Sequence, residues 1–67
     1  METFGKRLRD LRIEKGIAQE PLAKELGVSK SQISAWELNQ NEPTMSKLVL
    51  LAKYFKVTTD YLCGLED

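Results

Sequence analysis

The chain of 67 residues contains no histidine and a single cysteine, Cys63. One cysteine excludes a disulfide within the chain, which is typical of a reducing compartment, so a cytoplasmic location is expected. With one thiol and no imidazole, the usual zinc sites cannot be assembled. The commonest general base is also missing. We therefore expect no metal, no cofactor and no catalytic residue, and an enzyme is disfavoured.

Long apolar runs and an excess of charge of one sign are missing as well. The longest apolar run covers residues 48–52, far below the roughly 20 residues that cross a bilayer. Charged residues follow Met1 at once, so neither a signal peptide nor a membrane association is expected. A hydrophobic content of 42% nevertheless excludes a disordered chain, and the length permits one small domain, 1–67.

β-branched residues are sparse and never alternate over the length of a strand, which favours an all-α fold. Apolar residues recur at helical spacing, and Gly and Pro separate the helical segments. Thr3, Ser29 and Thr44 are candidate N-caps, and Asn39 can end a helix in place of Gly. The pattern predicts a compact five-helix bundle with helices at about 2–15, 19–26, 30–38, 45–55 and 59–63.

The second and third of these helices form a helix-turn-helix. A short turn at Gly27 joins them, Ala23 is small enough for the two helices to cross closely, and Val28 and Ile33 fill the angle between them. In such a motif the second helix enters the DNA major groove with its N-terminal residues.

A helical wheel separates two faces of the segment 30–38. Ile33, Trp36 and Glu37 fall on one arc, so Trp36 is expected to pack inward rather than to stack on bases. The opposite arc is short, polar and free of acids, as an approach to phosphates requires. It carries Lys30, Ser31, Ser34 and Ala35.

From residue 4 to residue 65 the chain resembles the phage repressor/Cro-like, or Xre-type, helix-turn-helix family, whose fold is the lambda repressor-like DNA-binding domain. Five consecutive segments match in register. The matching residues are Leu8, Arg9, Leu11, Arg12, Lys15, Gly16, Gln19, Leu22, Ala23, Leu26, Gly27, Val28, Ser29, Ile33, Ser34, Trp36, Glu37, Pro43, Thr44, Leu48, Leu51, Ala52, Phe55, Val57, Asp60, Tyr61, Leu62, Gly64 and Leu65.

The resemblance implies roles for the residues of the motif. Lys30, Ser31 and Ala35 match positions that face base edges. Ser34 matches a position near the DNA backbone, and we include it among the candidate base-reading residues. Ala35 offers only a methyl contact, for example to a thymine methyl group. Lys30 could bind guanine O6/N7 or a phosphate, and these alternatives stay open. Arg12 and Glu37 match an ion pair that joins the first and third helices, and we expect them to form it rather than to contact DNA.

The residues expected at phosphates surround the motif. Gln19 matches a phosphate-binding position, although a merely solvated side chain remains the alternative, and Ser29 lies near the backbone. Around the third loop, the amides at a helix N-terminus favour a phosphate. The further candidates there are Gln40, Asn41, Ser46 and Lys47. Asn39 and Gln40 replace a Gly and a basic residue of the family pattern, which removes one charge near the backbone.

The predicted function is a sequence-specific regulator that binds double-stranded DNA, most simply a repressor, acting on a palindromic operator as a homodimer. The resemblance and leftover apolar side chains suggest a dimer surface at Val57, Thr58, Tyr61 and Leu65. A protein antagonist could regulate it, and a bacterial or phage origin and association with the nucleoid are implied.

The zero net charge opposes this prediction, because DNA-binding domains usually carry a basic surface. However, residues 1–35 hold seven basic and five acidic residues, and residues 36–67 hold three and five. The part with the motif is thus mildly positive. The alternative is a protein-interaction module of a regulatory circuit that binds DNA weakly or not at all.

Overall fold

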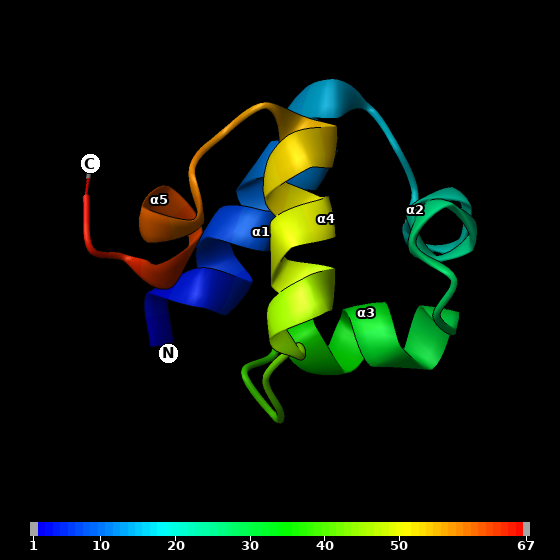
Figure 1. The fold of residues 1–67 in the computed structure, drawn as a ribbon. Helices are drawn as coiled ribbons and strands as arrows, with labels where there is room; N and C mark the ends of the chain where they lie inside the picture. The colour runs from blue at the N-terminus through cyan, green and yellow to red at the C-terminus, as the bar shows by residue number, and fades with distance from the viewer. Residues whose placement is uncertain (1, 67) are drawn as a thin grey trace.

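The computed structural model describes residues 2–66 as five α-helices joined by short loops (Figure 1). The helices are α1 (Glu2–Lys15), α2 (Gln19–Leu26), α3 (Lys30–Glu37), α4 (Met45–Phe55) and α5 (Thr59–Cys63). The predicted all-α bundle is confirmed, with one boundary moved. Leu38, expected inside the third helix, is its C-cap, with φ −91° and ψ 3°.

Local capping explains where three of the helices begin. Ser29, Thr44 and Thr58 accept hydrogen bonds from backbone N–H groups three residues ahead, at 3.1, 3.3 and 2.9 Å. These bonds satisfy donors that the first turn of a helix leaves without partners. Thr3, in contrast, was wrongly predicted as an N-cap, because α1 already includes it. For α2, Ala18 provides no side-chain cap.

Two residues other than glycine end helices in the left-handed conformation. Asn39 follows the C-cap of α3 with φ 58°, as the sequence predicts. Lys56 is the C-cap of α4, also with φ 58°. Its N–H donates to the carbonyl of Lys53, which closes the last turn of α4.

The core lies where α1, α2 and α3 meet α4 and α5. Its fully buried large side chains come from all five helices, so no helix is a peripheral addition. They are Phe4, Leu8, Leu22, Ile33, Trp36, Leu51 and Leu62. None of the helices within residues 2–66 combines the length and the apolar character that crossing a membrane would require.

The first turn of α1 touches the end of α3 with no side chain between them. Gly5 is buried there, and a Cβ atom at this position would lie 2.5 Å from the carbonyl oxygen of Glu37 and 2.7 Å from that of Trp36. Such distances are closer than atoms can approach. Glycine is therefore required at position 5 for this packing of α1 on α3.

Arg7 connects α1 to α5, which lies beside it (Figure 1). Its guanidinium donates to the carbonyl oxygen of Tyr61 at 2.6 Å and to that of Glu66. It also lies 4.2 Å from the centre of the Tyr61 ring, within the range of a cation–π interaction. α5 has only five residues and one of them, Leu62, is buried. The contacts with Arg7 therefore help to hold α5 against α1.

Candidate nucleic-acid interface

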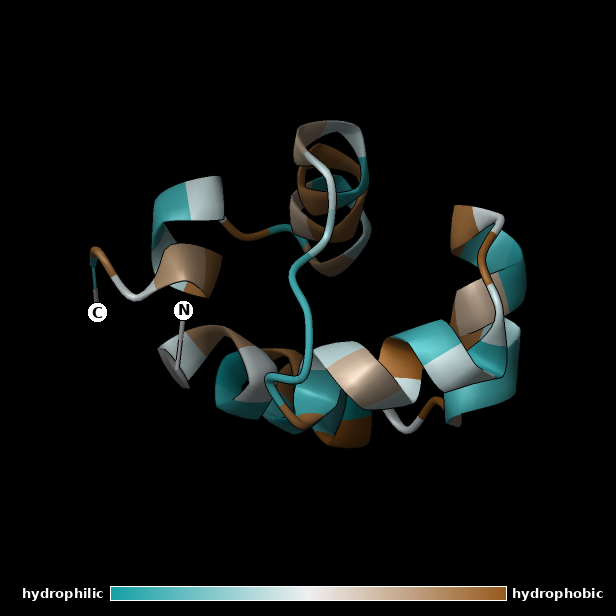
Figure 2. Cartoon of the chain, turned by 90° about the horizontal axis from the view of Figure 1, so that it is seen from below, coloured by the Kyte–Doolittle hydropathy of each residue, from teal (hydrophilic) through white to brown (hydrophobic). Residues whose placement is uncertain are grey.

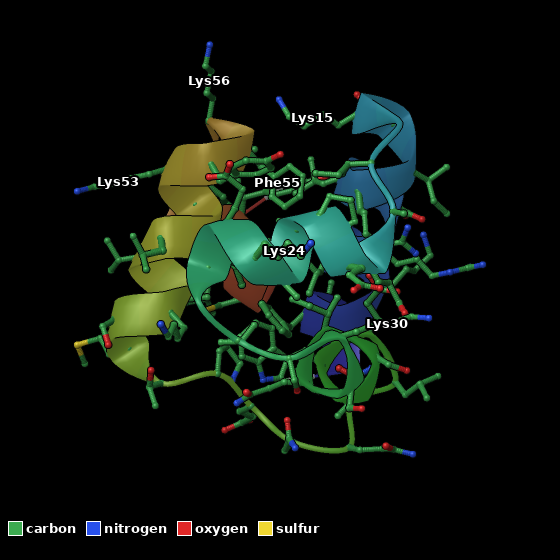
Figure 3. All side chains as sticks on the ribbon, turned by 90° about the vertical axis from the view of Figure 1, so that its right-hand side faces the viewer. Lys15, Lys24, Lys30, Lys53, Phe55 and Lys56 are labelled. Atoms are coloured by element: carbon green, nitrogen blue, oxygen red, sulfur yellow. The ribbon has the colours of Figure 1, made fainter. Side chains whose placement is uncertain are left out.

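α2, a tight turn and α3 form the predicted helix-turn-helix. Gly27 ends α2 with φ 69°, and Ser29 begins α3 two residues later. Figure 3 shows α3 nearly end-on beneath α2, so the two helices cross rather than run side by side. Ile33 is fully buried and Val28 packs against the core, which is the filling of the angle that the sequence predicts.

The inner face of α3 is fixed by burial. Trp36 has no exposed surface, so the prediction that it packs inward is confirmed. Glu37 is 9% exposed, which is exceptional for a carboxylate and requires a partner. The outer face remains accessible, because Lys30 and Ser31 are exposed. Ser34 and Ala35, on the same face, are half-buried.

The outer face of α3 borders a shallow hollow of about 430 Å³, which we call the α3 concavity. It brings together all four predicted base-reading residues and two of the predicted phosphate contacts, and no acidic side chain lines it. The lining residues are Gln19, Lys30, Ser31, Ser34, Ala35 and Gln40. No hydrogen bond or ion pair with the described residues engages the Lys30 ammonium group.

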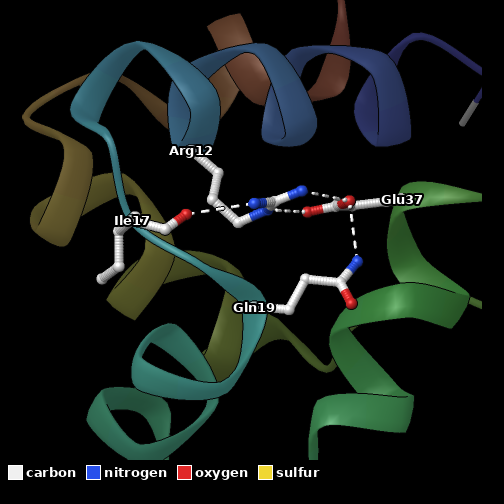
Figure 4. Close-up of polar contacts among 4 residues, drawn as sticks. All are labelled: Arg12, Ile17, Gln19 and Glu37. Carbon is white, nitrogen blue, oxygen red and sulfur yellow. Dashed lines mark hydrogen bonds and ion pairs between the residues drawn. The ribbon is translucent and has the colours of Figure 1, made fainter.

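A polar network joins α1, α2 and α3 beside the α3 concavity, because Gln19 belongs to both (Figure 4). The Arg12 Nε donates to Glu37 Oε2 at 2.6 Å, and its second terminal nitrogen donates to Oε1 at 3.2 Å. Arg12 also donates to the carbonyl oxygen of Ile17 at 3.0 Å. The structure thus contains the ion pair that the resemblance implies between the first and third helices.

Gln19 extends this network to the surface. Its Nε2 donates to Glu37 Oε1 at 3.0 Å. Glu37, paired with a guanidinium, accepts hydrogen bonds and donates none, so the carboxylate determines which end of the Gln19 amide faces it. The carbonyl oxygen of Gln19 is therefore turned away from Glu37, toward α3 in Figure 4. Gln19 is half-buried rather than fully solvated.

The predicted phosphate contacts around the third loop differ in their surroundings. Gln40 and Asn41 are exposed in the loop between α3 and α4, whose part near α3 is hydrophilic in Figure 2. Ser46 Oγ lies 3.4 Å from the hydroxyl of Thr44. The Lys47 ammonium instead donates to the carbonyl oxygen of Leu26 at 2.7 Å, at the C-terminal end of α2. Lys47 thus already has a structural partner.

The four predicted dimer-surface residues lie around α5 but are not equally available. Val57 packs against the core, and Tyr61 lies under Arg7. Thr58 caps α5 and donates its hydroxyl to the carboxylate of Glu66. Leu65 is 77% exposed.

Among the described residues, no three His, Cys, Asp or Glu side chains come close enough together to hold a metal ion. Cys63 is a half-buried free thiol within α5.

Sequence reasoning missed one contact beside the candidate interface. The side-chain oxygen of Asn39 accepts a hydrogen bond from the backbone N–H of Gly5 at 3.1 Å. The two residues are 34 positions apart. The only local signal is a glycine within an otherwise regular helix, which lowers helix propensity and needs a packing reason.

The fold and this face of α3 define a helix-turn-helix domain. The family model HTH_3, described as helix-turn-helix, matches residues 8–62. The chain therefore belongs to this family, and the resemblance to its Xre-type members is confirmed.

The chain is 39% identical over 64 residues to the uncharacterized HTH-type transcriptional regulator YobD of Bacillus subtilis, covering 96% of this chain and 57% of YobD. It is 41% identical over 64 residues to the HTH-type transcriptional activator BcrR of Enterococcus faecalis, covering 96% of this chain and 31% of BcrR. The chain thus spans less than two thirds of these relatives.

Among solved structures, the c2 repressor of Salmonella phage P22, crystallised with a synthetic operator, superposes with a TM-score of 0.89. Its sequence is 36% identical, and the match covers 94% of this chain and 96% of that chain. The predicted repressor-like fold is confirmed by this likeness.

Proposed function

We propose that the chain binds double-stranded DNA in a sequence-specific manner and acts as a transcriptional repressor. The observation that carries this proposal is the α3 concavity, where polar side chains and a lysine without a partner among residues 2–66 line a hollow to which none of these residues adds an acid. The likeness to the P22 c2 repressor, which was crystallised with an operator, supports it. A catalytic role is not part of the proposal.

In the proposed complex, the N-terminal half of α3 lies in the major groove. Lys30, Ser31, Ser34 and Ala35 face the bases, and Lys30 discriminates most strongly because it is the charged residue among the described residues that line the concavity. The groups that hold the phosphates and fix the register surround them. These are Gln19, Ser29, Gln40, Asn41, Ser46 and Lys47.

Two copies of the chain bind one operator in this proposal. A twofold axis places the two α3 helices in successive major grooves, roughly 34–36 Å apart, so the operator is a palindrome. The dimer surface includes Leu65, whose exposed side chain is otherwise unexplained, together with Val57, Thr58 and Tyr61. The protein acts in the cytoplasm, and a protein antagonist is a further proposed partner.

Selection of bound duplexes from a random pool tests the proposal. Wild type should enrich a palindromic consensus, and Lys30→Ala should weaken binding by about 1–3 kcal/mol and relax one position in each half-site. Lys24→Ala is the matched control, because this exposed lysine on α2 lies outside the α3 concavity. An unenriched pool from a folded protein would refute the DNA-binding proposal.

The salt dependence of binding separates this function from a protein-interaction module. Log affinity for the selected duplex should fall linearly with log salt concentration, since phosphate neutralisation releases counterions. The zero net charge of the chain favours the interaction module as the second candidate. A flat salt response, or no binding at low salt, would favour that candidate.

A further inference from the structure

Asn39 occupies a turn where a glycine would meet the backbone requirement without strain. Its φ of 58° lies in the left-handed region, which glycine adopts readily and asparagine tolerates. The backbone alone therefore does not explain a side chain at this position. The side chain does have a specific partner, because its Oδ1 accepts from the N–H of Gly5 at 3.1 Å.

The contact between this side chain and α1 is close, although Asn39 itself is exposed. Gly5 has no Cβ, and one built there would lie 2.9 Å from Nδ2 of Asn39 as well as against the end of α3. The amide of Asn39 thus lies against the backbone of the first turn of α1. A loop residue that belongs to the DNA-facing side of the molecule is in this way attached to a helix outside the helix-turn-helix.

Gln40, the residue after Asn39, belongs to the candidate interface. Gln40 donates its N–H to the carbonyl oxygen of Ala35 at 2.9 Å, and Asn39 donates its own to that of Trp36 at 3.1 Å. Gln40 lines the α3 concavity beside the base-reading residues. The backbone at 39–40 is held by α3 on one side, and the Asn39 side chain is held by α1 on the other.

We propose that Asn39 is a positioning residue for DNA binding. Its hydrogen bond to Gly5 fixes the orientation of the loop, so that Gln40 and Asn41 are already directed at the DNA backbone when α3 enters the groove. Asn39 itself need not touch DNA. This inference rests on the proposed function. It adds a contact with α1, outside the helix-turn-helix, that prepares the loop for DNA binding.

The substitution Asn39→Gly tests the role with little disturbance of the backbone. Glycine keeps the left-handed conformation and removes only the side chain, so the chain should remain folded. In the free protein, hydrogen exchange of the Gly5 amide and of the loop amides at Gln40 and Asn41 should become faster. Affinity for the selected duplex should fall about fivefold, similarly for all base substitutions, because phosphate contacts carry no sequence information.

A double-mutant cycle distinguishes positioning from a general structural effect. In a Gln40→Ala/Asn41→Ala background, Asn39→Gly should cause no further loss of affinity, because the side chains that it orients are gone. An equal loss in both backgrounds, or unchanged affinity of Asn39→Gly, would overturn the inference. So would loop amides that exchange at the wild-type rate.

The design also separates this inference from the proposed function. If the wild-type chain binds no duplex, the proposed function fails and the inference fails with it, whatever the loop amides do. If wild type binds and the cycle is additive, only the role of Asn39 is refuted.

Discussion

The two faces of α3 differ in how strongly the rest of the molecule holds them. On the inner face, Trp36 is completely buried and Glu37 is bound by groups from α1 and α2. On the outer face, Lys30 has no partner among the described residues, and Ser31 is exposed. The difference indicates that the inner face contributes more to stability, and it leaves the outer face free for the DNA contacts that we propose.

The largest effect should come from removing the charge that pairs with Glu37. Arg12→Met leaves a carboxylate that is 9% exposed without its cation, so the free energy of unfolding should fall by about 3–5 kcal/mol. Urea denaturation measures the change. Arg9→Met, at an exposed position on the same helix, is the control. A loss no larger than that of the control would show that the ion pair does not hold the inner face.

Gly5→Ala should give the next largest effect, because its methyl group would meet the carbonyl oxygens of Trp36 and Glu37. Separating α1 from α3 should lower the free energy of unfolding by about 1–3 kcal/mol, since these neighbours are backbone atoms that cannot rotate away. Thermal denaturation compares it with Glu14→Ala, an exposed site on α1. Equal stability of the two variants would mean that the helices separate without penalty.

Gln19, on α2, contacts both faces of α3, because it bonds Glu37 and lines the α3 concavity. Its substitution tests whether stability and DNA binding depend on separate residues. Gln19→Met keeps the length of the side chain and removes its bond to Glu37, and the free energy of unfolding should fall by about 1 kcal/mol. Affinity for the selected duplex, measured where the variant is fully folded, should fall as well. Unchanged affinity would assign Gln19 to the inner face alone.

Lys30→Ala should have the smallest effect on folding. The side chain is exposed and unpaired in the described structure, so the free energy of unfolding should stay within about 0.5 kcal/mol of wild type. The same variant is expected to lose DNA affinity. A clear loss of stability would show that the outer face also supports the fold.

Most helix boundaries could be predicted because their signals are local. Ser29 caps a donor three residues away, and Gly27 takes the conformation that ends α2. Helical spacing alone places Lys30 and Ser31 opposite Trp36, so the α3 side of the concavity could be predicted, whereas Gln19 and Gln40 join it through the tertiary fold. For the pair of Arg12 and Glu37, in contrast, helical spacing places only Glu37 on the inner arc, and the family resemblance implies its partner.

What the sequence could not predict depends on tertiary contacts. The bond between Asn39 and Gly5 joins residues 34 positions apart, and the one between Lys47 and Leu26 joins residues 21 apart. Neither contact has a periodic signature, and the glycine within α1 is the only local sign of the first one. The sequence therefore predicts Lys47 at a phosphate and gives no indication that the carbonyl oxygen of Leu26 also accepts a hydrogen bond from its ammonium group.

Trp36 gives the protein an intrinsic optical probe. It is the single tryptophan of the chain, has no exposed surface, and its indole N–H has no hydrogen-bond acceptor among the described residues. A fully buried indole emits at a shorter wavelength than one in contact with water, so exposure on unfolding shifts the emission to the red. Unfolding can therefore be followed without a label. A duplex bound on the opposite side of α3 should leave the emission wavelength of Trp36 unchanged.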